Sequence, residues 1–204
     1  MITQFISIHL TFQPLFINRK ERFHVKIMID AGHGPETPGK RTPDGRMKEF
    51  EFNQAVTLLV KKELEETGHV VILSNNGQRD ISLQERTSLA NKLKVQAFIS
   101  IHANAFGSSW NEVSGIETFT YTKPSDQSKI LARLIQDALC ALLKRNDRGI
   151  KRANFAVVRD TNMPAVLVEC GFMTNKEEAY LLQTEQYRLL CAKAIAYGIL
   201  CWNK

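Results

Sequence analysis

The chain has 204 residues, of which 44% are hydrophobic and 24% are charged. This length and balance exclude a disordered chain and predict one soluble domain with a sizeable core. No stretch approaches the ~20 uninterrupted apolar residues of a membrane-spanning helix, so we expect no membrane span. The formal net charge of +6 suits an acidic partner such as nucleic acid, an anionic membrane or an anionic wall polymer.

The first 24 residues are the hardest part of the chain to assign. Their apolar residues are interrupted by Gln, His and Pro. A secretory signal begins with positive charge and ends in small residues, whereas Lys20 and Arg22 follow the apolar stretch here. We therefore predict an N-terminal extension at residues 1–24 without an export signal, followed by a single folded domain at residues 25–204.

The first half of that domain alternates strands with helices. Short apolar runs bounded by turn residues predict strands at 25–29, 70–73 and 97–102. Helical spacing of apolar residues predicts a helix at 49–66, and an S-x-x-E capping box predicts another at 82–93.

The second half continues the alternation. Strands are predicted at 116–121, 155–158 and 164–169, and the clearest apolar stripe predicts a helix at 126–144. Asn175 and Thr184 are placed to begin two further helices. The pattern predicts one α/β domain with a mainly parallel sheet and helices on both faces.

Polar groups follow several of these strands. His33 lies just past the first strand, between two glycines that allow a sharp turn, while His102 and Glu169 end two later strands. Glu49 opens the first helix. Because the carboxyl ends of parallel strands line one edge of a sheet, we expect these groups to meet in one cleft.

Two imidazoles and one carboxylate are the ligand set of a catalytic zinc site. Zinc polarises a carbonyl and lowers the pKa of its water to ~7, and a second carboxylate can move that water's proton to a leaving nitrogen. The residues therefore predict amide hydrolysis without a covalent intermediate. The alternative is that His33 decorates a turn, His102 is a hydrogen-bonded core residue and Glu169 pairs with a basic side chain.

Several motifs resemble one family over roughly residues 26–202. They are Ile29-Asp-Ala-Gly-His-Gly-Pro35, Glu49-Phe-Glu-Phe-Asn53, Ser100-Ile-His-Ala-Asn104, Gly115-Ile-Glu-Thr118 and Pro164-Ala-Val-Leu-Val-Glu-Cys-Gly-Phe172. Their order and spacing resemble the zinc-dependent N-acetylmuramoyl-L-alanine amidases of autolysins, spore mother-cell lysis enzymes and phage endolysins. The resemblance implies a six-stranded sheet and a catalytic domain at residues 25–204.

The resemblance also implies the site and its reaction. One zinc ion would be held by His33, Glu49 and His102, with Glu169 as the catalytic carboxylate. The substrate would be peptidoglycan, cut at the amide between N-acetylmuramic acid and the L-alanine of the stem peptide. In the family the carboxylate ligand lies four residues before an asparagine, which selects Glu49 ahead of Asn53; Glu51 remains its rival.

Other residues of the motifs leave alternatives open. Cys170 adjoins Glu169 and invites a nucleophilic role, but it extends an apolar strand without an assigned activating group. All four cysteines lack C-x-x-C spacing and fit small core residues of a reducing compartment. Asn104 and Arg159 are candidate substrate contacts, with surface or structural roles as the alternative.

Other functions compete with the amidase. A zinc peptidase acting within the stem peptide needs the same metal chemistry, and a non-catalytic wall-binding module would bind walls without cutting them. Nucleic-acid binding is disfavoured because the basic residues are scattered and no basic helix is interleaved with aromatics. Many relatives carry a separate wall-binding module that is not visible here, so the positive charge could attract anionic wall polymers instead. We expect action at the bacterial cell wall after release on lysis, and no membrane partner.

Overall fold

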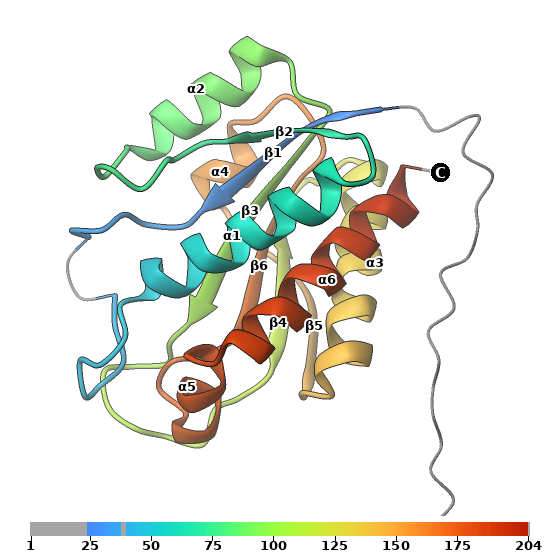
Figure 1. Ribbon diagram of the computed structural model, residues 1–204. Coiled ribbons are helices and arrows are strands. Elements are labelled where there is room, and N and C mark those ends of the chain that lie inside the picture. Colours follow the sequence, from blue (N-terminus) through green and yellow to red (C-terminus); the bar gives the residue numbers. More distant parts are fainter. Residues whose placement is uncertain (1–23, 38–39, 204) are drawn as a thin grey trace, which may run out of the picture.

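The computed structural model describes residues 24–37 and 40–203 (Figure 1). The extension predicted at residues 1–24 lies outside the described residues, apart from His24. In chain order the elements are β1 (Lys26–Ala31), α1 (Glu49–Glu65), β2 (Val70–Leu73), α2 (Leu83–Leu93), β3 (Ala97–Asn104), β4 (Ile116–Thr120), α3 (Asp126–Leu143), β5 (Asp147–Arg152), α4 (Ala156–Arg159), β6 (Ala165–Phe172), α5 (Lys176–Leu182) and α6 (Glu185–Trp202).

The strands form one six-stranded sheet in the order β2-β1-β3-β6-β4-β5. Strands β2, β1, β3 and β6 run parallel, and β4 pairs with β6 in the antiparallel sense. The predicted α/β fold with a mainly parallel sheet is therefore confirmed. The carboxyl ends of β1, β3 and β6 share one edge, and the amino end of β4 lies at the same edge.

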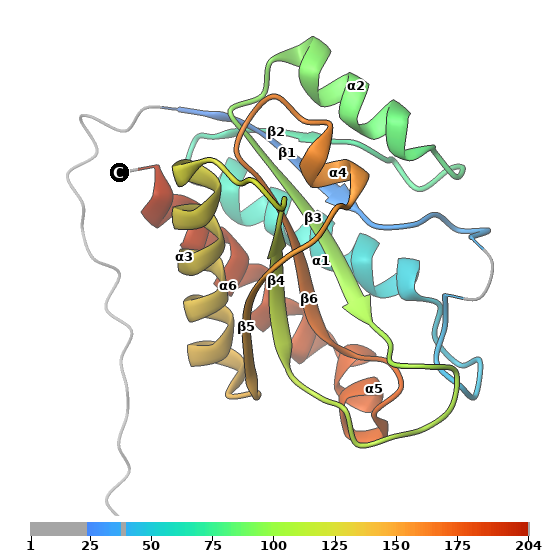
Figure 2. The same cartoon turned by 180° about the vertical axis from the view of Figure 1, so that it is seen from behind.

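Helices cover both faces of the sheet. Helices α1, α3 and α6 pack on one face over the larger core cluster, where the side chains of Ile29, Ile101 and Val168 are buried (Figure 1). Helices α2 and α4 cover the other face over a smaller cluster that contains Met28 and Phe98 (Figure 2). Alternate residues of β1 and β3 thus enter different cores, which explains why these strands read as nearly continuous apolar runs.

One predicted strand was wrong, and one strand was missed. The apolar run at 155–158 is not a strand but the short helix α4, with Phe155 as its N-cap. The strand between α3 and β6 is instead β5, Asp147–Arg152, which the sequence pattern did not predict. β5 pairs only with β4 and lies at the end of the sheet, so its charged residues can face solvent. An apolar β-branched run as short as 155–158 fits a strand or a packed helical turn equally well.

The predicted helix starts are confirmed by their caps. The Ser82 side chain accepts a hydrogen bond from Glu85 N and completes the capping box of α2. Asn175 caps α5 and Thr184 caps α6 through their side chains. Among the described residues, no helix is long and apolar enough to cross a membrane. All four cysteines are free thiols.

Candidate metal and catalytic site

The loop after β1 presents His33 through an unusual backbone conformation. The sequence suggests that the flanking glycines supply the turn, but the positive φ, 61°, falls on His33 itself. The glycines supply space instead. A Cβ on Gly32 would lie 2.1 Å from Cε1 of His102, and a Cβ on Gly34 would lie 2.0 Å from an oxygen of Asp80. A larger residue at Gly32 would displace the His102 ring, and one at Gly34 would displace Asp80.

Glu49, the first residue of α1, lies between two imidazoles. Its Oε2 is 3.1 Å from Nε2 of His33, and its Oε1 is 2.9 Å from Nδ1 of His102. One ligand atom from each of the three residues lies within 4.8 Å of the others. The structure therefore brings together the three side chains that the resemblance assigns to a metal.

The neighbours of Glu49 explain why the resemblance places an asparagine four residues later. Asn53 lies one helical turn on, and its Nδ2 donates to Oε1 of Glu49 at 3.2 Å and to the carbonyl oxygen of Gly32 at 3.0 Å. The backbone N–H of Ala103 donates to the same Oε1 at 3.3 Å. One amide side chain thus ties the carboxylate to the loop that carries His33.

The rival carboxylates lie elsewhere. Glu51 is exposed and accepts a hydrogen bond from Lys48 N at the start of α1. Glu36 is also exposed, and neither residue belongs to the group of possible ligands found among the described residues.

The imidazoles control the charge of Glu49. Burial would raise the pKa of this carboxyl, but the hydrogen bonds to His102 and His33 outweigh that effect and hold its pKa well below the usual range. Glu49 is thus ionised at neutral pH, as a metal ligand must be.

Glu169 lies beside this group with the opposite electrostatics. It pairs in register with His102 across β3 and β6, so the two side chains project from the same face of the sheet. Its Oε2 is buried and has no hydrogen-bond partner among the described residues. Burial raises the pKa of Glu169 well above its usual range, and the nearby charge of Glu49 raises it further. A carboxyl whose pKa is raised in this way holds a proton more readily than an ordinary glutamate, which suits a group that takes up and releases protons.

A charged cluster lies on the far side of Glu169. Glu117 pairs in register with Glu169 across β4 and β6. Its carboxylate accepts hydrogen bonds from Asn104 at 2.7 Å, from Arg148 at 2.8 Å and from Lys151. Burial would raise the pKa of Glu117, but Lys151 and Arg148 outweigh it and lower the pKa. Glu117 belongs to the Gly115–Thr118 motif, but the sequence alone indicates no role for it.

The remaining candidates have other surroundings. Asn104 contacts Glu117 near the site, whereas Arg159 lies on α4 and pairs with the adjacent Asp160. Cys170 is fully buried, and because side chains alternate along a strand it points away from the face that carries Glu169. This placement gives Cys170 a packing role.

Comparisons with known proteins agree with this arrangement. A family model described as N-acetylmuramoyl-L-alanine amidase matches residues 27–201. The N-acetylmuramoyl-L-alanine amidase LytC of Bacillus subtilis is 37% identical over 179 residues, which cover 87% of this chain and 35% of LytC. YqiI of the same bacterium is 36% identical over 174 residues, covering 85% of this chain and 82% of YqiI.

A solved structure extends the likeness to the fold. The crystal structure of an N-acetylmuramoyl-L-alanine amidase from Clostridium difficile 630 superimposes with a TM-score of 0.84 at 34% identity, covering 88% of this chain and 96% of that one. The family match spans nearly the whole described domain, and it confirms the resemblance and the enzyme class predicted from the sequence. The chain belongs to the N-acetylmuramoyl-L-alanine amidase family.

Proposed function

We propose that the protein is a zinc-dependent hydrolase of peptidoglycan that cuts the amide between N-acetylmuramic acid and the L-alanine of the stem peptide. The observation that carries the proposal is the meeting of His33, Glu49 and His102 within 4.8 Å, with Glu169 in register beside His102. Residues 25–204 form the catalytic domain in this proposal.

The three side chains fit a zinc ion. Two neutral imidazoles and one carboxylate leave a further coordination position free for water or substrate. Glu49 is held ionised, and its two oxygens already face a nitrogen of each ring. Asn53 and the Ala103 N–H orient the carboxylate from behind, as outer hydrogen bonds commonly do for metal ligands.

In this proposal zinc and Glu169 have different tasks in the reaction. When bound, zinc supplies Lewis-acid chemistry, polarising the amide carbonyl and acidifying water. As the water oxygen bonds to the amide carbonyl carbon, the carboxylate of Glu169 takes the water's proton. Glu169 then delivers that proton to the nitrogen of L-alanine as the carbon–nitrogen bond breaks. Its raised pKa lets the same oxygen act first as base and then as acid. The buried position of Oε2, without a competing donor among the described residues, keeps that oxygen available for the transfer.

The proposal includes a place and a partner. LytC and the sporulation-specific amidase of Bacillus subtilis bear the name of the amide bond they cut, which supports peptidoglycan as the substrate and the bacterial cell wall as the place of action. The net charge of +6 favours attraction to anionic wall polymers. Release on lysis is the route that we propose.

Mass spectrometry of digested peptidoglycan tests the proposal. Purified walls are incubated with the zinc-loaded protein, with protein treated with a chelator and with a Glu169→Gln variant. We expect stem peptides with a free L-alanine amino group from the first sample alone, and recovery when zinc is returned to the second. Fragments cut inside the stem peptide would instead identify a peptidase, and a zinc-loaded protein that binds walls without cutting them would identify a binding module.

A further inference from the structure

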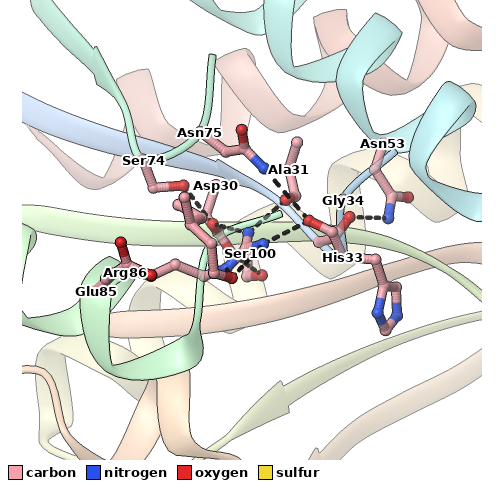
Figure 3. Close-up of polar contacts among 12 residues, drawn as sticks. Asp30, Ala31, His33, Gly34, Asn53, Ser74, Asn75, Glu85, Arg86 and Ser100 are labelled. Atoms are coloured by element: carbon pink, nitrogen blue, oxygen red, sulfur yellow. Dashed lines mark hydrogen bonds and ion pairs between the residues drawn. The ribbon is translucent and has the colours of Figure 1, made fainter. Parts of the chain in front are cut away.

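A buried arginine lies directly behind the loop that carries His33. Arg86, on α2, is 2% exposed. Its Nη1 donates to Oδ1 of Asp30 and to the carbonyl oxygen of Ala31, both at 2.6 Å, and its Nη2 donates to the carbonyl oxygen of His33 (Figure 3). A single guanidinium therefore holds the backbone on both sides of Gly32.

Arg86 contacts a backbone conformation that is unfavourable for a residue such as His33. A non-glycine residue with φ near 60° lies in the left-handed region, which residues with a Cβ adopt only at an energetic cost. The carbonyl oxygen of His33 receives one further donor, Nδ2 of Asn75 at 3.4 Å. If His33 relaxed to an ordinary conformation, its carbonyl would turn away from Arg86 and its imidazole would move from Glu49.

The surroundings fix the guanidinium itself. Asp30 is buried and accepts hydrogen bonds from the hydroxyls of Ser74 and Ser100 as well as from Arg86. The ion pair and these bonds satisfy the carboxylate without water. Because a guanidinium is planar and offers donors in several directions, it can reach Asp30 and two carbonyls together, whereas an ammonium group is a single point of charge.

The start of α2 also places Arg86. The capping box of Ser82 and Glu85 fixes the first helical turn immediately before it. In Figure 3 the His33 ring points away from Arg86, while its carbonyl points toward the arginine. The contact thus acts on the backbone and does not involve the ring, whose Nε2 faces Glu49.

We infer that Arg86 is a positioning residue for His33: by holding the carbonyl oxygens of Ala31 and His33 it keeps the imidazole aimed at the metal position beside Glu49. The inference rests on the proposed function, since it assigns support to a ligand of the proposed zinc. It extends the metal site to α2, an element that contributes no ligand.

Zinc affinity tests the inference with a matched pair of variants. Arg86→Lys keeps the positive charge but removes the planar guanidinium with its several donors. Arg145→Lys makes the same change at a partly buried arginine that pairs with Glu177 and Glu178 instead. Competition with a chromophoric chelator measures zinc binding by the metal-free proteins, and the visible spectrum of the cobalt-loaded proteins reports the ligand geometry. We expect Arg86→Lys to bind zinc roughly 10–100-fold more weakly, with an altered cobalt spectrum, and Arg145→Lys to match wild type in both.

A double variant covers the case in which Arg86→Lys does not fold. Arg86→Met with Asp30→Asn removes both charges, so no buried charge is left unpaired, and we expect a folded protein with the same loss of zinc affinity. Wild-type affinity and cobalt spectrum in either folded Arg86 variant would overturn the inference alone, and loss of folding in both would reduce Arg86 to a structural residue. A wild-type protein that binds no zinc would overturn the proposed function and the inference with it.

Discussion

Two carboxylates lie at the edge of the sheet where β1, β3 and β6 end, and they differ in their neighbours: Glu49 is buried, and Oε2 of the half-buried Glu169 is buried as well. Glu49 faces two imidazoles, the Asn53 amide and a backbone N–H. Oε2 of Glu169 faces no donor among the described residues. Burial favours protonation of both, yet the pKa of Glu49 falls and that of Glu169 rises. Hydrogen-bond partners, rather than depth, decide which carboxylate stays ionised.

This difference suits two distinct tasks. A ligand must remain an anion throughout turnover, while a proton-transfer group must bind a proton and release it. The difference in hydrogen-bond donors arises from topology. Helix α1 places Glu49 between the loop after β1 and the end of β3, where donors surround it. Strand β6 places Glu169 beside His102, where no donor among the described residues reaches its Oε2. Changing Glu49 should therefore abolish metal binding, whereas changing Glu169 should abolish proton transfer and leave the metal bound.

The largest effect is expected from Glu49→Gln. Its loss removes one proposed ligand and the shared partner of both imidazoles, so we expect loss of stoichiometric zinc and of activity together. The weakening should exceed the roughly 100-fold caused by losing an outer hydrogen-bond partner. Elemental analysis of the purified variant measures the zinc. Glu51→Gln is the matched control, and zinc loss there with retention in Glu49→Gln would reverse the assignment.

Glu169→Gln should separate binding from turnover. The substitution keeps the shape of the side chain but removes its ability to move a proton, so we expect full zinc content and a fall in kcat of about 10²–10⁴-fold. Zinc content and the rate of stem-peptide release are measured on the same preparation. A variant that loses its zinc, or that turns over at the wild-type rate, would contradict the role given to Glu169.

The site residues differ in how far the sequence alone could predict them. His102 and Glu169 could be found because each is a polar residue at the end of an otherwise apolar strand, and parallel topology brings such ends together. Glu49 was selected over Glu51 by resemblance alone. Its physical reason, the bridge from Asn53 to the His33 loop, depends on contacts between segments 21 residues apart.

Other features left no readable pattern. Strand β5 is a charged segment at the end of the sheet and shows no apolar alternation. Arg86 lies in a short polar helix where arginine is commonly exposed, so nothing local indicated that it is buried against Asp30. The positive φ of His33 was likewise not predicted, because glycine is the residue that usually adopts positive φ and two glycines flank this position. Buried polar contacts between distant segments were the part that the sequence did not reveal.

A smaller effect is expected on the stability of the metal-free protein. The folded-state pKa of Glu169 lies above its unfolded value, so its favourable contribution is present below about pH 4 and is lost as the pH rises through the folded pKa. Glutamine cannot ionise, and metal-free Glu169→Gln should therefore melt roughly 2–4 °C higher than metal-free wild type near neutral pH. Calorimetry across pH should show the difference shrinking toward about pH 4; an equal or lower Tm at neutral pH would count against an unpaired buried carboxylate.

The smallest effect is expected from Glu117→Gln, which changes a neighbour of Glu169 without touching the metal ligands. The negative charge of Glu117 contributes to the raised pKa of Glu169, and its removal also frees Lys151 and Arg148 to attract that carboxylate. Both changes lower the pKa of Glu169. Because the base form begins the reaction, the acid limb of the kcat/KM profile of the zinc-loaded enzyme should move to lower pH by less than about one unit. Glu112→Gln, an exposed change five residues away, should leave the limb in place. A shift toward higher pH in Glu117→Gln would mean that Glu117 acts through the geometry of β4 rather than through its charge.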